Sequence, residues 1–192
     1  TVTASDWDGN PLTYSAANLP AGSTFDPATR IFTWTPTYEQ AGTYPNIHFE
    51  VSDGAEIDSE DITITVNSVN RAPVLDAIGN KSVAENETLT FTVAASDPDG
   101  DPLIYSVSNL PEGANFNPLT QIFTWTPDYE QAGTYSDIHF EVSDGTISDS
   151  EDITITVNSV NRAPILNPIG NQSIAENTTL TFTVTASDWD GN

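Results

Sequence analysis

The chain of 192 residues contains no cysteine and only four residues with a fixed positive charge, against 28 acidic residues. Without disulfides, its stability must come from core packing, hydrogen bonds or bound metal. The formal net charge of −24 argues against a nucleic-acid partner, because contacts to phosphate require Lys and Arg. The same imbalance makes cations from solution a natural complement to the fold.

Long hydrophobic runs are absent as well. No apolar stretch reaches membrane-spanning length and no signal peptide is present, so we expect no membrane insertion in this segment. The sequence starts within a repeated pattern and without Met, and we expect it to be part of a longer protein. Trp, Tyr, Phe and Ile recur at regular spacing, which predicts an ordered fold despite the acidic composition.

No stretch has the period of an amphipathic helix; apolar and polar residues instead alternate with a period of two. The clearest alternating runs are Leu89–Val93, Phe123–Trp125, Ile138–Val142 and Ile153–Val157. Turn clusters rich in Asn, Pro, Gly and Asp separate these runs. Roughly seven short strands in about ninety residues predict an all-β fold, a two-sheet sandwich of immunoglobulin type.

Two local features refine this prediction. Tyr135, in Gly133-Thr134-Tyr135, is placed like the tyrosine corner of immunoglobulin-type folds. The odd spacing from Tyr135 to Ile138 predicts a bulge or bend in that strand. The stretch around Phe116 is expected to be irregular. Trp34 and Trp125 occupy one repeat position and are predicted to lie in the core, with a carbohydrate-stacking platform as the alternative.

An acidic loop occurs three times, at 6–10, 97–101 and 188–192, with successive copies 91 residues apart. The repeat unit is best cut at Asn-Arg-Ala-Pro, which starts at Asn70 and at Asn161. We therefore predict a sandwich without its first strands at 1–70, a complete sandwich at 71–161 and the opening strands of a third repeat at 162–192. Residues 1–10 and 183–192 are identical, which indicates a higher repeat of 182 residues.

The order of the predicted strands gathers the acidic residues at the two ends of the complete sandwich. The members of these two clusters are Asp97, Asp99 and Asp144 at one end, and Glu85, Asp128 and Glu130 at the other. In a tandem linear array, opposite ends of successive repeats meet, and two unneutralised carboxylate clusters would repel each other. Ca²⁺ suits mixed sets of carboxylate, amide and carbonyl oxygens, so calcium is predicted at the junctions.

The motifs Ser-Asp-x-Asp-Gly, Asp-Tyr-Glu and Glu-Val-Ser-Asp-Gly resemble those of cadherin-type repeats, in particular the dystroglycan-type cadherin-like and immunoglobulin-like domains of bacterial and archaeal surface proteins. The resemblance covers the whole chain and implies junction calcium. The ligands that it implies are Glu85, Asp128, Glu130, Asn161, Asp188 and Asp190 at the second junction and Glu39, Asn70, Asp97, Asp99 and Asp144 at the first. Asp6, Asp8 and Asp53 hold the equivalent positions in the first repeat.

The linkers depart from the cadherin pattern. They carry Arg71 and Arg162 where further ligands would be expected, and Thr37 stands at the position of Asp128 in the first repeat. The alternative interpretation is therefore that Asp97 and Asp99 only shape the turn through side-chain hydrogen bonds, and that a linker arginine neutralises a neighbouring acid.

Taken together, these features predict a structural repeat of an extracellular or cell-surface stalk, fibre or adhesin, and not an enzyme. Its partners would be neighbouring repeats of the same or identical chains. One alternative is an adhesion module that binds a cell-surface carbohydrate or protein. Another is a head-to-tail filament, in which residues 162–182 of one copy supply strands to the next copy.

Overall fold

The computed structural model describes residues 1–190 and divides into two compact units, Thr1–Asn70 and the part from Arg71 onward. Gly191 and Asn192, the end of the third acidic loop, lie outside the described residues. Within the described part, no helix is long and apolar enough to cross a membrane. Strands and one short turn of helix make up the regular structure of both units.

The first unit contains five strands and one 3-10 turn. Its elements are β1 (Thr13–Ala17), β2 (Thr24–Asp26), β3 (Ile31–Thr33), η1 (Tyr38–Gln40), β4 (Gly42–Ser52) and β5 (Ile57–Val66). One sheet has the order β1-β4-β5, and β2 pairs with β3 in the other. All these strand pairs are antiparallel.

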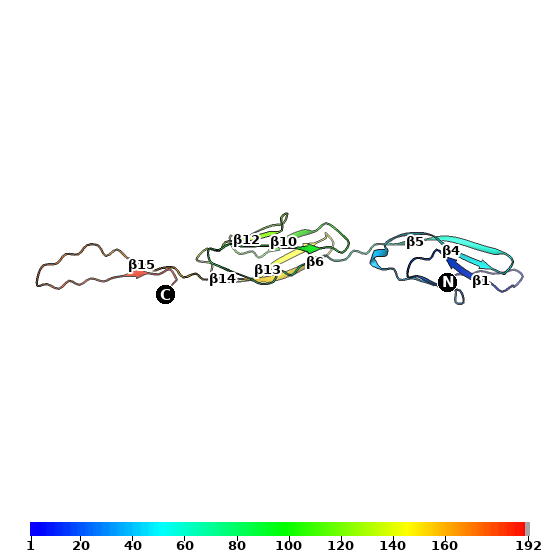
Figure 1. Cartoon of the computed structure of the whole chain (residues 1–192), viewed down its shortest axis with the longest axis horizontal. Coiled ribbons are helices and arrows are strands. Elements are labelled where there is room, and N and C mark those ends of the chain that lie inside the picture. Colours follow the sequence, from blue (N-terminus) through cyan, green and yellow to red (C-terminus); the bar gives the residue numbers. More distant parts are fainter. Residues whose placement is uncertain (191–192) are drawn as a thin grey trace. The chain divides into compact units, whose positions relative to one another are not determined.

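The second unit holds the complete sandwich and the start of the next repeat (Figure 1). Its strands are β6 (Val74–Leu75), β7 (Lys81–Ala84), β8 (Leu89–Thr92), β9 (Ala95–Ser96), β10 (Ile104–Ser108), β11 (Asn115–Asn117), β12 (Ile122–Trp125), β13 (Gly133–Ser143), β14 (Ser148–Asn158), β15 (Ile165–Leu166) and β16 (Ala186–Ser187). The two main sheets are β10-β13-β14-β7 and β11-β12-β8. In the first, β7 runs parallel to β14.

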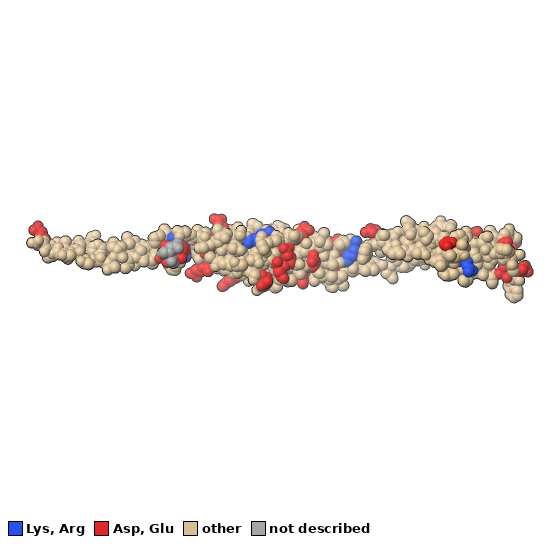
Figure 2. Space-filling view, turned by 90° about the horizontal axis from the view of Figure 1, so that it is seen from below, with Lys and Arg blue, Asp and Glu red and all other residues tan. Residues whose placement is uncertain are grey.

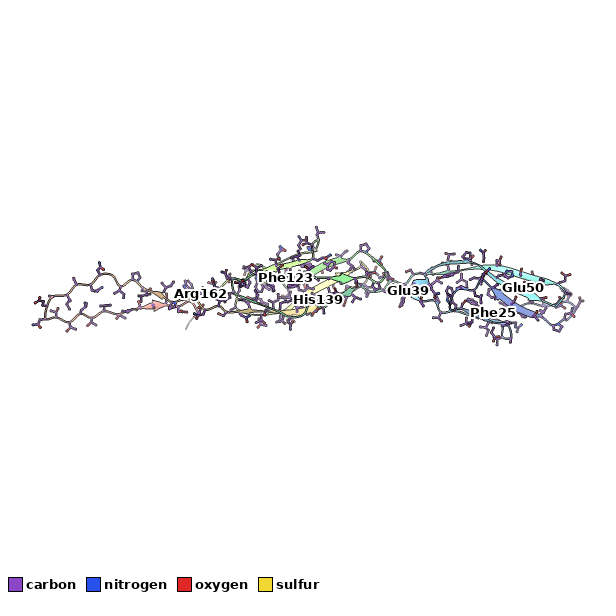
Figure 3. The ribbon with its side chains drawn as sticks, in the orientation of Figure 1. Phe25, Glu39, Glu50, Phe123, His139 and Arg162 are labelled. Atoms are coloured by element: carbon purple, nitrogen blue, oxygen red, sulfur yellow. The ribbon has the colours of Figure 1, made fainter. Side chains whose placement is uncertain are left out.

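The core of the second unit lies between these two sheets. Phe123 and Trp125 of β12 face Phe140 of β13 and Ile155 of β14, and all four are at most 1% exposed. Phe123 lies within the body of the sandwich (Figure 3). The alternation of buried and exposed residues along β12 and β14 reproduces the period of two seen in the sequence.

The first unit has a more open core. Phe32, Trp34 and Ile64 stand at the repeat positions of Phe123, Trp125 and Ile155, yet each is only partly buried. The reason is visible in the second unit, where β7 and β8 cover these positions. The described part of the first unit contains no counterpart of these two strands.

Both local predictions for the long strand are confirmed. The Tyr135 hydroxyl donates a hydrogen bond of 3.0 Å to the carbonyl oxygen of Gln131, as a tyrosine corner does. The register of β13 and β14 shifts between Tyr135 and Ile138, which is the expected bulge. Asp137, inside the bulge, has a φ of 60°. Tyr44 and Asn46 repeat both features in the first unit.

Three details differ from the sequence prediction. The stretch around Phe116 is a short strand, β11, because it pairs with β12 over three residues. The long strand begins at Gly133 and continues through the bulge, well before the expected Ile138. A single 3-10 turn closes at Tyr38–Gln40, where Gln40 Oε1 accepts a hydrogen bond from the Thr37 N–H.

Candidate functional site

The first aspartate of each acidic loop shapes the loop itself. Asp97 Oδ1 accepts the N–H groups of Asp99 at 2.7 Å and Asp101 at 3.2 Å. Asp6 does the same for Asp8 and Asn10, and Asp188 accepts the N–H of Asp190 at 2.8 Å. These bonds are the side-chain turn that the sequence suggested as one alternative. In the loops at 97–101 and 188–190, the second aspartate, Asp99 or Asp190, has a different partner.

In the second unit that partner is the linker arginine. The Arg71 backbone N–H donates to Asp99 Oδ2 at 2.6 Å, and Arg71 Nε donates to Oδ1 at 2.9 Å. Arg71 Nη2 lies 2.8 Å from the same Oδ1 and also donates to the Pro98 carbonyl oxygen at 2.6 Å. Both oxygens of Asp99 are therefore engaged by a guanidinium and its own backbone.

Arg162 repeats this arrangement one repeat later. Its backbone N–H donates to Asp190 Oδ2, and its Nε donates to Asp190 Oδ1 at 3.1 Å. The guanidinium also lies 4.8 Å from the ring centroid of Tyr129 and 5.6 Å from that of Trp189. Arg162 stands where the chain leaves the sandwich towards β15 (Figure 3). It thus contacts the sandwich through Tyr129 and the next repeat through Trp189 and Asp190.

These contacts alter the titration of the two aspartates. The side-chain and then the backbone hydrogen bonds from Arg71 hold the pKa of Asp99 below its usual value, while the nearby Asp144 charge opposes this. The backbone hydrogen bond from Arg162 is the largest cause of the lowered pKa of Asp190, followed by its side-chain bond and charge. Both carboxylates are thereby held in the charged form that pairs with arginine.

The opposite end of the sandwich carries Glu85, Asp128 and Glu130. Glu85 is 3% exposed, and its Oε2 accepts the N–H of Val160 at 2.8 Å. Asp128 Oδ1 accepts the N–H of Glu130 at 2.9 Å, while the Glu130 side chain is exposed. The strand order predicted from the sequence places these residues at the end of the sandwich where β14 ends, and the Glu85 N–H indeed donates to the carbonyl oxygen of Asn158 there.

A divalent ion fits the acidic loop only in part. Among residues 1–190, the group of three acidic side chains whose oxygens lie within 4.8 Å of one another is Asp97, Asp99 and Asp101. Asp97 Oδ2 is buried without a hydrogen-bond partner and could serve as a ligand. Asp99, however, already holds Arg71 through both oxygens. The loop therefore offers one available ligand oxygen, on Asp97, next to a carboxylate, Asp99, that is already paired with arginine.

The remaining predicted ligands are spread over several loops. Asp144 and Asp53 each accept two backbone N–H groups within their own turns, at 144–147 and 53–56. Glu39 lies exposed in η1, and Asn161 is exposed next to Arg162. Among residues 1–190, no three acidic side chains of the second predicted ligand set have oxygens that all lie within 4.8 Å of one another. The full ligand sets stay predictions.

Two side-chain pairs were not expected from the sequence. His48 Nδ1 lies 2.7 Å from Asp61 Oδ1, and His139 Nδ1 lies 2.7 Å from Asp152 Oδ1. Both pairs join directly opposite residues of the long hairpins. Counting residues outward on both strands from the Ser-Asp-Gly turn places each histidine opposite its aspartate, so the sequence could have predicted these pairs.

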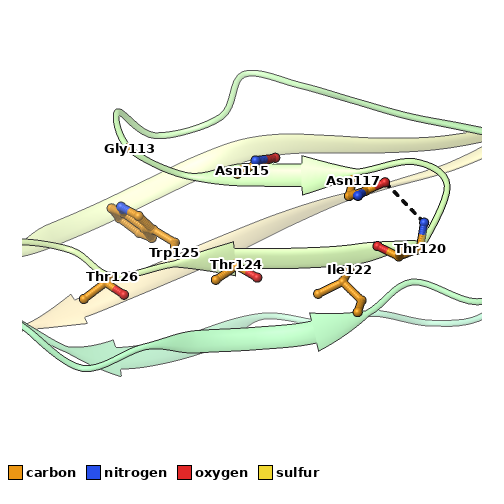
Figure 4. A pocket seen from close by; sticks show the side chains of 8 residues that line it. All are labelled: Gly113, Asn115, Asn117, Thr120, Ile122, Thr124, Trp125 and Thr126. Carbon is orange, nitrogen blue, oxygen red and sulfur yellow. Dashed lines mark hydrogen bonds between the residues drawn. The ribbon is translucent and has the colours of Figure 1, made fainter.

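A shallow groove of about 470 Å³ lies on the outer face of β11 and β12 (Figure 4). The residues that line it, none of them charged, are Gly113, Asn115, Asn117, Thr120, Ile122, Thr124, Trp125 and Thr126. This is unusual in so acidic a chain, whose Asp and Glu side chains are scattered over the view of Figure 2. Trp125 donates through Nε1 to the Glu112 carbonyl oxygen and is 1% exposed, so the core prediction for it is confirmed and a stacking platform is not.

Comparison with known proteins identifies the family. A family model described as "Putative Ig domain" matches residues 1–67 and 72–158. The chain belongs to this Ig-domain family. The predicted all-β, immunoglobulin/cadherin-like fold in tandem is confirmed.

Several curated proteins contain related segments. The Ig-domain chain is 32% identical over 125 residues to chitinase A of Pseudoalteromonas piscicida, covering 64% of this chain and 15% of that protein. It is 29% identical over 147 residues to integrin beta-like protein C of Dictyostelium discoideum, covering 66% and 7%. A serine-rich adhesin for platelets of Staphylococcus aureus is 24% identical over 161 residues, covering 83% and 7%. The chain thus spans only 7 to 15% of the length of these relatives.

Solved structures agree on the fold. The EC3-6 segment of protocadherin gammaB7 superposes with a TM-score of 0.52 at 19% identity, covering 96% of this chain and 53% of that one. The EC1-2 segment of human protocadherin-24 gives 0.50 at 18% identity, covering 82% and 86%. At this identity the likeness concerns the fold alone.

Proposed function

We propose that these Ig domains form part of an extracellular array of tandem repeats, which spaces or presents adhesive parts of a surface protein. The observation that carries the proposal is the short connection from β14 to β15. Its Val160 N–H is held by the buried Glu85, and its Arg162 contacts both the sandwich and the loop of the next repeat. A connection tied on both sides limits bending between repeats.

Several observations support a non-enzymatic role. The acidic groups at the two ends of the sandwich lie in turns that they shape by hydrogen bonds, and the groove on its outer face is shallow and uncharged. Its match to chitinase A covers 15% of that protein, a share that suits an accessory domain. The matches to integrin beta-like proteins and to an adhesin suit a surface location.

Small-angle X-ray scattering of the full chain tests the array. If the sandwiches of roughly 40 Å each follow one another as a stiff array, the proposal predicts an elongated particle whose maximum dimension is a simple multiple of that length. A compact particle, or a scattering curve typical of freely hinged domains, would overturn the proposal. Cleavage of chitin or another glycan by the isolated chain would overturn the non-enzymatic role.

Calcium is a second candidate element of the same function. The unpartnered Asp97 Oδ2, close to Asp99 and Asp101, favours a weak ion site in the acidic loop. When bound, the ion would neutralise this loop and stiffen it. Isothermal titration with Ca²⁺ against an Asp97→Asn variant tests it: heat that disappears in the variant supports the site, and no heat with the parent chain refutes it.

Binding of an uncharged glycan is an alternative role that the groove favours. Asn and Thr side chains line it without a charge, and Asn117 is already oriented by hydrogen bonds from Leu119 and Thr120. Such a surface matches the hydroxyl groups of a neutral polysaccharide better than an anionic one. The test compares retention of the parent chain and of a Thr124→Asp variant on chitin or glucan beads. Retention of the parent chain alone would support this role. Equal retention of both proteins, or none, would refute it.

Strand donation between copies is favoured by a further set of contacts. In the second unit, Asp149 and Glu151 accept the N–H groups of Leu75, Ile78 and Gly79. The same acids recur in the first unit as Asp58 and Glu60, and the same donors recur at 166, 169 and 170. The donor segment also exposes apolar side chains, namely Ile165, Leu166, Ile169, Ile174, Leu180, Phe182 and Val184.

Residues 162–182 of one copy could therefore complete the first unit of another copy. Sedimentation velocity over a concentration series tests this. Growing head-to-tail oligomers, abolished by Phe182→Asp, would support donation; a monomer at every concentration would exclude it. The Leu119→Asp variant, at a side chain that is 91% exposed and outside both surfaces, is the matched control.

A further inference from the structure

Arg162 occupies the place at which one repeat ends and the next begins. The middle sandwich ends with β14 at Asn158, and the next repeat starts with β15 at Ile165. Between them, Arg162 is only partly exposed, with 25% of its side chain accessible, and Asp190 with 11%. A charged pair so well covered, on a linker of a few residues, is unlike a mobile surface ion pair.

Arg162 contacts both repeats. On the sandwich side, its guanidinium lies 4.8 Å from the ring centroid of Tyr129. On the side of the next repeat, it lies 5.6 Å from the Trp189 ring and pairs with Asp190. A planar guanidinium can stack on rings and form in-plane hydrogen bonds at the same time, which neither a lysine nor a metal ion can do.

The linker is also fixed just before Arg162. Glu85, which is 3% exposed, accepts the N–H of Val160 at 2.8 Å. The Arg162 N–H itself donates to Asp190. Two backbone N–H groups of the linker are thus held by carboxylates from opposite sides of the junction.

This arrangement conflicts with a calcium ion at the same junction. Asp190 would be a ligand in the set that the cadherin resemblance implies, yet both of its oxygens accept hydrogen bonds from Arg162. The other acids of that set do not converge with it in a group of three. A fixed positive charge already occupies the position in which an ion would be useful.

We propose that Arg162 is the linking cation of this junction: it replaces calcium and holds the Asp188–Asp190 loop of the next repeat against Tyr129 of the preceding one. The inference rests on the proposed role in a tandem array. Its partner surface is specific, since it needs the second aspartate of the loop and an aromatic ring on the preceding repeat.

The pairing of a linker arginine with the second aspartate of the acidic loop has two forms, which differ in the residue between the two aspartates. In the Asp97–Asp99 loop it is Pro98, and the arginine there bonds the Pro98 carbonyl oxygen. In the Asp188–Asp190 loop it is Trp189, whose ring adds a second face for the guanidinium. Trp189 is 66% exposed, whereas Trp7, in the identical loop of the first unit, is 101% exposed. Trp189 is therefore about a third less exposed than its counterpart in the first loop.

NMR spectroscopy of the full chain tests the proposal through the Arg162 Nε–H group. In the parent chain, in the presence of a chelator, we expect slow exchange of this proton and nuclear Overhauser contacts to the rings of Tyr129 and Trp189. Trp189→Pro, which copies the other loop, should remove the contacts to residue 189 and keep those to Tyr129. Arg162→Lys and Arg162→Gln should each reduce the protection of the Val160 and Arg162 amides from exchange, roughly tenfold.

Arg30→Gln is the matched control, because Arg30 also lies over a ring, that of Tyr14, but outside any linker. It should leave the amides of residues 160–162 unchanged. A freely exchanging Arg162 Nε–H without ring contacts would overturn the proposal, as would its displacement on addition of Ca²⁺. These signals report side-chain contacts of Arg162. The proposal about Arg162 can therefore fail this test while scattering still shows an elongated array.

Discussion

The burial of two isoleucines at the same repeat position predicts a difference in their contributions to stability. Ile155 is fully buried between β13 and β7, whereas Ile64 is partly exposed because the described first unit has no counterpart of β7 and β8. Replacing either with alanine removes three carbon atoms. The predicted loss of stability should therefore follow the burial of each site.

For Ile155→Ala, the lost transfer free energy is about 2.5 kcal/mol, and the cavity brings the total to about 3–4 kcal/mol. For Ile64→Ala, partial exposure should limit the loss to about 1–2 kcal/mol. Ile122→Ala is the surface control in the second unit, since Ile122 is 40% exposed, and it should cost less than about 1 kcal/mol.

Hydrogen exchange measured by mass spectrometry across a urea series can separate the two repeats, because peptides from 47–66 and 138–157 differ in sequence. Each peptide reports the free energy of opening of its own unit. Equal losses for Ile64→Ala and Ile155→Ala would refute the reasoning, because they would mean that the first unit closes its core by another route. If the loss of stability caused by Ile64→Ala increases with protein concentration, strand donation between copies is indicated.

Three further predictions concern single contacts. Tyr135→Phe removes the hydroxyl bond to Gln131 and should lower the free energy of unfolding of the second unit by about 1 kcal/mol in urea titrations; no change would show that the tyrosine corner adds nothing. Glu85→Ala leaves the Val160 N–H without its acceptor and should cost about 2 kcal/mol, with Glu85→Gln costing less; the reverse order would contradict the role of this bond. Because the pKa of Asp190 is lower in the folded state, its ion pair should stabilise the junction fully above about pH 4 and lose this effect as the pH falls through the folded pKa. Amide protection at Arg162 measured against pH checks this, and an Asp190→Asn variant should show no such dependence.

Much of the fold could be predicted because its signals are local. The alternation along Ile153–Val157 identifies a strand with one buried face, and the spacing from Tyr135 to Ile138 identifies a bulge. The strand around Phe116 was missed because it pairs over three residues, too few for a period to show. The parallel pairing of β7 with β14 depends on tertiary contacts that no local pattern contains.

The site was predictable in position but not in its contacts. Strand order placed Glu85 and Asp128 at one end of the sandwich and Asp97 and Asp144 at the other, as the structure has them. Whether an arginine or an ion meets the second aspartate depends on the path of the Arg162 side chain past Tyr129, and the sequence left both possibilities open. The histidine–aspartate pairs required the hairpin register, which the sequence analysis did not apply.

The central claim is that Arg162, and not a metal ion, fixes the junction between the middle sandwich and the next repeat. The absence of cysteine makes a direct measurement simple, since spin labels can be attached at Ser106→Cys and Thr181→Cys alone. Both positions are exposed, one on the middle sandwich and one on the next repeat. In chelator, pulsed electron paramagnetic resonance should give one narrow distance distribution, which broadens when Arg162→Gln is added and is unaffected by Arg30→Gln. Equal widths with and without Arg162, or a distribution that narrows only when Ca²⁺ is supplied, would contradict the account.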